Sequence, residues 1–172
     1  PIILSPEYKP EQYKIFFVDE NGNQILEPIV TKNDKFNPPS IPDRENYFCN
    51  YWQSENQTGS YNSSVTLTKL ETTFVADYEL KSIELKFQNE NDIVYNMSVY
   101  NTRYSGGYEY FRDYGSYIMF GNVSTPSAPE TDETKEFSHW ECQETGQTFS
   151  AEENINRIDT VSTELNFIAV YK

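Results

Sequence analysis

The fold is decided by the stretch PPSIPDRENYFCNYW, residues 38–52, because much of its pattern returns as TPSAPETDETKEFSHW, residues 125–140. Each stretch contains a Pro-Ser-x-Pro segment and ends in a tryptophan. The tryptophan follows the second proline by 10 positions in the first stretch and by 11 in the second. A pattern that returns in the same order predicts an internal repeat.

Two further landmarks flank these stretches in the same order. Upstream, Ile15-Phe16-Phe17 corresponds to Leu85-Lys86-Phe87, and downstream, Phe74–Tyr78 corresponds to Phe167–Tyr171. From the upstream phenylalanine to the Pro-Ser segment there are 22 positions in the first copy and 39 in the second. Insertions usually fall in surface loops. We therefore expect a linker (residues 1–10), a first module (residues 11–79) and a second module (residues 82–172) with an insertion at about residues 94–120.

Short aromatic and β-branched runs, typical of strands, connect these landmarks. Asn21-Gly22, after the run Tyr13–Val18, predicts a hairpin closed by a two-residue type I′ turn, with Gln24–Val30 as the return strand. A calcium loop beginning at Asp19 is the alternative, but its glycine stands at position 4 rather than 6. The expected aromatic core consists of Phe17, Trp52, Phe74, Tyr78, Phe87, Phe137, Trp140, Phe167 and Tyr171.

One short helix or turn is expected in the second module. Ser150-Ala151-Glu152-Glu153 resembles a capping box, which predicts a helix or turn over residues 151–158. The predicted fold class is therefore mostly β, of the α+β type, with two small modules in tandem.

The landmarks together resemble the Listeria–Bacteroides repeat, the group that includes the internalin B-repeat. The matching residues are Asn21-Gly22, Pro39, Pro42, Cys49 with Trp52 and Phe74-Ala76-Tyr78, then Pro126, Pro129, Phe137 with Trp140 and Phe167-Ala169-Tyr171. The resemblance implies β-grasp-like modules of a cell-surface or secreted protein of a Gram-positive bacterium, serving as spacer, adhesion or host-contact units. It implies no catalytic residue. The chain departs from the family pattern at Cys49, Tyr51 and His139 and in its long insertion.

Composition excludes several classes of partner. The chain carries 13 basic and 27 acidic residues, a formal net charge of −14, with no basic run. Nucleic acids and anionic lipids need clustered Lys and Arg, so neither is an expected partner. The longest apolar runs fall far short of the roughly 20 residues that span a bilayer. Because Pro1 is no natural start, the chain is interpreted as part of a longer protein, located outside the cell, at the surface or in the wall.

No catalytic, metal or cofactor motif stands out. The chain lacks G-x-S-x-G, H-E-x-x-H, C-x-x-C and phosphate-binding glycine motifs, and we expect no enzyme, no metal and no cofactor. Its single histidine, His139, has no nucleophile motif to accompany it. Cys49 and Cys142 are interpreted as lone thiols, and a disulfide between them is the alternative.

The insertion is unusually rich in tyrosine, with seven of the chain's 14 tyrosines between Tyr95 and Tyr117. Ser105-Gly106-Gly107 predicts the tip of a hairpin between Val99–Tyr104 and Tyr108–Arg112. Tyrosine offers rigid, amphipathic contact area, which binding loops favour. The candidate binding residues are Tyr104, Tyr108, Tyr110 and Tyr114; the alternative is that this hairpin packs its rings on the neighbouring sheet.

The expected function is a non-enzymatic spacer and adhesion or interaction unit of a larger surface protein. Its partner would be a host or cell-surface protein or a glycan. The alternative is a carbohydrate-binding module that uses the tyrosine-rich hairpin.

Overall fold

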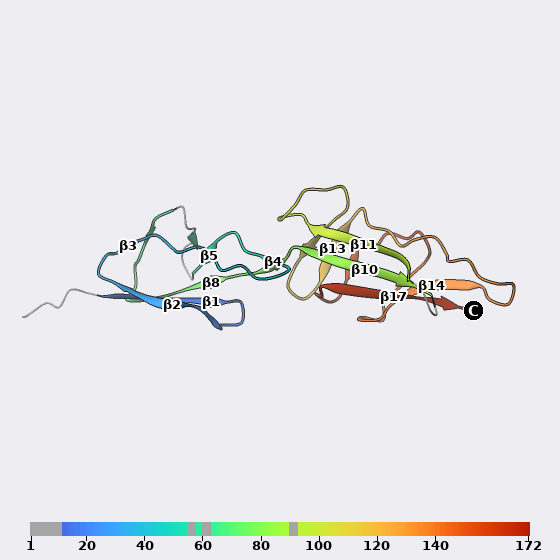
Figure 1. Ribbon diagram of the computed structural model, residues 1–172, viewed down its shortest axis with the longest axis horizontal. Helices are drawn as coiled ribbons and strands as arrows, with labels where there is room; N and C mark the ends of the chain where they lie inside the picture. The colour runs from blue at the N-terminus through green and yellow to red at the C-terminus, as the bar shows by residue number, and fades with distance from the viewer. Residues whose placement is uncertain (1–11, 55–57, 60–62, 90–92) are drawn as a thin grey trace, which may run out of the picture. The chain divides into compact units, whose positions relative to one another are not determined.

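The computed structural model describes residues 12–54, 58–59, 63–89 and 93–172, so the expected linker lies outside the described residues. The chain divides into two compact units, Pro1–Tyr78 and Glu79–Lys172 (Figure 1). Within the described ranges every regular element is a β-strand, which confirms a mostly β protein. The α+β component is wrong, because these ranges contain no helix, and hence none that could cross a membrane.

The first unit contains a mixed sheet and a short two-stranded ladder. Its strands are β1 (Tyr13–Asp19), β2 (Gln24–Thr31), β3 (Lys35–Phe36), β4 (Tyr47–Phe48), β5 (Trp52–Gln53), β6 (Thr58–Gly59), β7 (Val65–Thr66) and β8 (Glu71–Ala76). The sheet has the order β2-β1-β8-β5-β6, and β3 pairs with β7. The central strands β1 and β8 are parallel. Parallel neighbours need a long connection, and here the intervening chain supplies the outer strands of the same sheet.

The second unit contains a larger sheet. Its strands are β9 (Glu79–Leu80), β10 (Ser82–Gln88), β11 (Ile93–Asn101), β12 (Tyr110–Asp113), β13 (Ile118–Gly121), β14 (Phe137–Cys142), β15 (Thr148–Phe149), β16 (Arg157–Ile158) and β17 (Glu164–Tyr171). The sheet order is β15-β14-β17-β10-β11-β12-β13-β16. Five neighbouring strands of this sheet, in the order β11-β10-β17-β14-β15, correspond to β2-β1-β8-β5-β6 of the first unit in both order and direction. The strands β10 and β17 form the parallel pair. Figure 1 shows β11, β10 and β17 lying side by side.

The parallel pairs of the two units have corresponding registers. Phe17 is the partner of Phe74 in one unit, and Phe87 is the partner of Phe167 in the other. Their rings stack at centroid distances of 6.1 Å and 4.5 Å. All four side chains are completely buried. The residues that correspond in the sequence therefore also correspond in the sheets.

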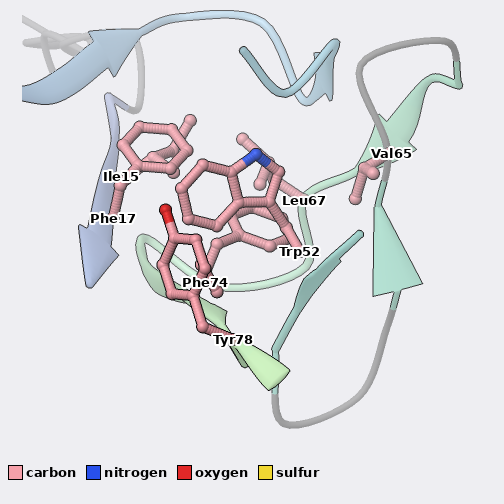
Figure 2. Packing of buried hydrophobic residues seen from close by; sticks show 8 residues of the cluster. Ile15, Phe17, Trp52, Val65, Leu67, Phe74 and Tyr78 are labelled. Atoms are coloured by element: carbon pink, nitrogen blue, oxygen red, sulfur yellow. The ribbon is translucent and has the colours of Figure 1, made fainter. Parts of the chain in front are cut away.

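The two tryptophans lie on the next strand out in the same register. Trp52 pairs antiparallel with Ala76, and Trp140 pairs antiparallel with Ala169. Each indole is fully buried and lies against the phenylalanine of the first central strand, at centroid distances of 5.1 Å in the first unit and 5.4 Å in the second. Figure 2 shows the indole of Trp52 among the aromatic and aliphatic side chains of the first core.

The Pro-Ser-x-Pro segments position these indoles. The Nε1–H of Trp52 donates to the main-chain oxygen of Pro39 at 2.8 Å, and that of Trp140 donates to Pro126 at 3.2 Å. A buried indole N–H needs such an acceptor. Proline keeps its segment extended, so the carbonyl is not taken up by a helix or a sheet ladder. The carbonyl of Pro126 also accepts the amide of Glu152 at 3.2 Å.

Most of the expected core residues are buried. Exposure is between 0% and 8% for Phe17, Trp52, Phe74, Tyr78, Phe87, Trp140 and Phe167. Phe137 and Tyr171 are only half-buried, and their rings meet edge to face at the margin of the second core. Cys142 lies in that core as a buried free thiol.

The β1–β2 hairpin forms, but the expected type I′ turn is wrong. The amide of Gly22 donates to the oxygen of Asp19 at 3.0 Å, and Gly22 has a φ of +84° whereas Asn21 keeps a negative φ. A type I turn followed by a left-handed glycine gives a three-residue loop. The Asp19 carboxylate accepts the amides of Asn23 and Asn21, which lower its pKa, Asn23 most strongly. That capping favours the type I turn and occupies the carboxylate of the alternative calcium loop.

Of the helix or turn expected over residues 151–158, the helix does not form: residues 151–152 form a turn, and the segment pairs with residues 120–125. Half of the capping box forms, since the amide of Ser150 donates to Glu153 at 3.1 Å. The buried hydroxyl of Thr125 then donates to the oxygen of Ser150 and accepts the amide of Glu153. The amide of Ile155 donates to the main-chain oxygen of Val123. The backbone of this segment therefore forms hydrogen bonds with a neighbouring segment instead of the bonds of a helix.

We expect Thr125→Val to destabilise the second unit by about 1–2 kcal/mol. Valine conserves the volume but removes both bonds to the turn at residues 150–153. The freed groups belong to exposed residues and water reaches them, which limits the loss. Urea unfolding measures it, with the exposed Thr134→Val as control. A stability change no larger than that of the control would contradict this role for Thr125.

Candidate functional site

The four candidate tyrosines lie in the second unit, in different environments. Tyr104 and Tyr108 belong to the segment between β11 and β12, with exposures of 47% and 79%. Tyr110 is the first residue of β12 and is half-buried, whereas Tyr114 follows β12 and is 50% exposed. The four side chains therefore differ in exposure and in the element that carries them.

The expected hairpin around Ser105–Gly107 is wrong, because β11 and β12 pair in parallel. The tyrosine-rich segment leaves β11, crosses, and returns in the same direction. The amides of Tyr104 and Ser105 both donate to the main-chain oxygen of Asn101 at 3.0 Å, which turns the chain before the glycines are reached. The antiparallel partner of β12 is β13, so the true hairpin lies one strand later.

The β12–β13 turn explains that pairing. Gly115 has a φ of +89°, and its amide donates to the carboxylate of Asp113 at 2.8 Å. The amide of Tyr114 donates to the oxygen of Tyr117 at 3.0 Å. Asp-Tyr-Gly-Ser-Tyr is thus the turn sequence, with aspartate as the capping acceptor and glycine in the left-handed region.

Tyr110 has a packing role. Its ring lies directly over Gly121, its antiparallel partner on β13, where a Cβ would stand 2.2 Å from the ring. An aromatic side chain that covers a cross-strand glycine supplies packing that the glycine lacks. This accords with the alternative that the insertion packs its rings on the sheet.

Tyr104 and Tyr108 each have a contact that helps to position them. The Lys81 ammonium lies 5.2 Å from the ring centroid of Tyr104, within cation–π range. The side-chain amide of Asn122 donates to the main-chain oxygen of Tyr108 at 2.8 Å. This bond fixes the backbone of Tyr108 and leaves its ring in solvent.

Tyr114 belongs to a three-layer stack. Its ring is nearly parallel to that of Tyr117, with 5.0 Å between centroids and 7° between planes. The guanidinium of Arg157, from β16, lies 3.9 Å from the centroid of Tyr117. Arg157 is itself held by Asp159 at 2.7 Å. Two segments, the β12–β13 turn and the chain around β16, therefore contribute to this stack, and half of the Tyr114 side chain remains exposed.

A small hollow of about 60 Å³ adjoins this ring. It is lined by Glu79, Asn101, Arg103, Arg112, Asp113 and Tyr114. Of the four candidate tyrosines, Tyr114 alone lines it within the described part of the chain. A hollow of this size accommodates a group of a few atoms, such as a carboxylate, but not a sugar ring.

The polar groups that line the hollow differ in whether they already have hydrogen-bond or ion-pair partners. Arg103 forms an ion pair with Glu79 at 3.4 Å. The carboxylate of Asp113 accepts the amide of Gly115. Arg112 is exposed, and its guanidinium has no hydrogen-bond or carboxylate partner in the ranges that the structure describes. The donors of Arg112 are therefore available to a ligand.

Asn101 supports this site from within. It is completely buried; its side chain donates to the oxygen of Leu80 at 3.1 Å and accepts the amide of Arg103 at 2.9 Å. Sequence reasoning missed Asn101, Arg103 and Arg112. The turn sequence Asp113–Tyr117, which sequence reasoning did not use, is a local signal that could have located Tyr114 at a hairpin turn.

His139 contacts the residue that precedes it. Its Nδ1 lies 2.8 Å from the hydroxyl of the adjacent Ser138, in β14. Across the described ranges, no group of three histidine, cysteine, aspartate or glutamate side chains is placed to hold a metal ion.

Comparisons with known proteins leave the family undecided. No family model matches the chain, and no curated protein matches it either. The resemblance to the Listeria–Bacteroides repeat therefore rests on the sequence motifs alone and stays a prediction.

Proposed function

We propose that this chain is a non-enzymatic tandem unit of a larger, secreted or cell-surface bacterial protein, acting as spacer and as adhesion or interaction unit. The observation that carries the proposal is the correspondence of the two units. Both place a phenylalanine pair on parallel central strands and a tryptophan on the next strand, in the same registers. Duplication of a small sheet lengthens a protein without creating a new active site.

The finer proposal is that each unit is a β-grasp-like module without its helix. In its support, the first and last long strands are parallel neighbours, and a hairpin partner flanks one side of this pair. The added strands β12, β13 and β16 then extend the second module beyond β11.

The proposed contact surface lies on this extension. Tyr104, Tyr108 and Tyr114 expose about half or more of their side chains, and tyrosine is a low-entropy contact residue. A strong net negative charge of −14 keeps the rest of the surface soluble and weakly adhesive. The open ring of Tyr114 favours the second candidate function, carbohydrate binding, because sugar rings stack on such faces.

Adhesion of coated beads tests the proposed function. Beads carrying the full chain are expected to be retained on cultured epithelial cells or on immobilised matrix proteins under flow. Beads carrying chemically unfolded chain serve as the control. Equal retention of both kinds of bead would overturn the interaction role. Catalytic turnover of a polysaccharide or peptide by the purified chain would overturn the non-enzymatic role.

A further inference from the structure

We infer that Tyr114 and Arg112 form a binding site for a sugar that carries a carboxylate, such as a uronic or sialic acid. The sugar ring stacks on the open face of Tyr114, and the carboxylate enters the adjoining hollow toward Arg112. The inference deepens the proposed interaction role, on which it rests, by naming a site and a ligand class.

The ring of Tyr114 has the properties of a stacking platform. The ring stacks on that of Tyr117, which also lies within 3.9 Å of the Arg157 guanidinium, and the side chain of Tyr114 remains 50% exposed. The axial C–H groups of a pyranose ring present a flat, apolar surface that packs against an aromatic face. Since the stack already fixes the ring, little side-chain entropy is lost when a ligand binds.

Arg112 gives the site its selectivity. A planar guanidinium offers paired N–H donors that match the two oxygens of a carboxylate. Arg112 precedes the capping residue Asp113 and pairs with Met119 of β13, which fixes its backbone. The hollow that it lines with Tyr114 has the size of a carboxylate rather than of a sugar ring.

The acidic groups nearby do not oppose an anion strongly. Glu79 is paired with Arg103, and Asp113 accepts a main-chain amide from Gly115. The remaining negative charge of the chain is screened over about 8 Å at physiological salt. A neutral sugar would use the platform but leave the donors of Arg112 to water, so the acidic sugar is the better match.

Isothermal titration of the full chain tests the site with tri-galacturonate, sialyllactose, galactotriose and lactose. We expect one or both acidic oligosaccharides to bind at least tenfold more tightly than their neutral counterparts, and the one that binds identifies the source of the carboxylate. Equal affinity for neutral and acidic sugars, or no binding of either acidic sugar, would overturn the inference.

Matched variants locate the site. Arg112→Gln is expected to weaken binding of the acidic sugar about ten- to a hundredfold, and Tyr114→Ala by about tenfold or more. Tyr114→Phe keeps the stack and most of the affinity. Tyr51→Ala removes an exposed tyrosine of the first unit, outside the hollow, and is expected to leave the affinity unchanged. All variants are first checked for native near-ultraviolet circular dichroism. A loss with Tyr51→Ala equal to that with Arg112→Gln would overturn the assignment.

The two proposals fail separately. If coated beads adhere to cells but no acidic sugar binds, the interaction role stands and the sugar site is wrong. If an acidic sugar binds with these variant effects while beads do not adhere, the sugar site stands and the adhesive role is wrong.

Discussion

Trp140→Ala is expected to lower the free energy of unfolding of the second unit by about 3–5 kcal/mol. The indole is completely buried, lies 5.4 Å from the ring of Phe87 and 5.3 Å from that of Phe137, and donates to Pro126. Alanine leaves a large cavity that strands of a β-sheet cannot collapse to fill. Denaturant unfolding gives the loss, and hydrogen exchange with mass spectrometry is expected to show faster exchange across Glu79–Lys172.

Two further variants make this test specific. Trp52→Ala is expected to cause a loss of the same order in Pro1–Tyr78, because Trp52 has the corresponding register and hydrogen bond. Trp140→Phe keeps an aromatic ring but removes the Nε1–H, so it is expected to cost about 1–3 kcal/mol. If Trp52→Ala and Trp140→Ala both accelerate exchange in only one unit, the correspondence of the two cores is wrong.

The sequence was most informative where side chains alternate between core and solvent. Phe17 and Phe74 recur as Phe87 and Phe167 because a parallel pair buried on one face requires large apolar residues at fixed positions. The tryptophan positions follow from the same requirement, with a proline carbonyl as the acceptor of the indole. Such constraints act within a few residues of each landmark, so they remain readable despite the insertion.

Turn and cap signals were less informative, because distant partners decide between locally acceptable conformations. The capping box at Ser150 forms one of its two bonds. The hydroxyl of Thr125 binds the main-chain oxygen of Ser150 and the amide of Glu153, and no helix forms. Ser105-Gly106-Gly107 is a favourable sequence for a hairpin turn, yet the main-chain oxygen of Asn101 turns the chain earlier. The antiparallel partner of β12 is then β13. Neither Thr125 nor Asn101 lies in a local sequence pattern that indicates which main-chain groups its side chain will bind.

The hollow was out of reach of sequence reasoning for the same reason. Arg103, Arg112 and Tyr114 meet there because β11 and β12 pair in parallel, a pairing that the tyrosine-rich sequence does not encode locally. Tyrosine content alone pointed to four residues, of which Tyr114 lines the hollow and Tyr110 covers Gly121.

Asn101→Ala is expected to destabilise the second unit by about 2–3 kcal/mol. The substitution leaves the buried oxygen of Leu80 and the amide of Arg103 without their partners, and an unsatisfied buried group costs about 1–3 kcal/mol. The segment after β11 then loses the side chain that fixes Arg103 beside Glu79. Urea unfolding measures the loss, and hydrogen exchange is expected to quicken at the amides of residues 103–105.

Asn96→Ala is the matched control, since Asn96 lies on the same strand with its side chain exposed. Surface substitutions of this kind usually change stability by less than about 0.5 kcal/mol. If Asn101→Ala destabilises the unit no more than Asn96→Ala, the bonds to Leu80 and Arg103 do not support the segment. If it destabilises the unit but residues 103–105 exchange no faster, Asn101 contributes to the core without positioning Arg103 at the hollow.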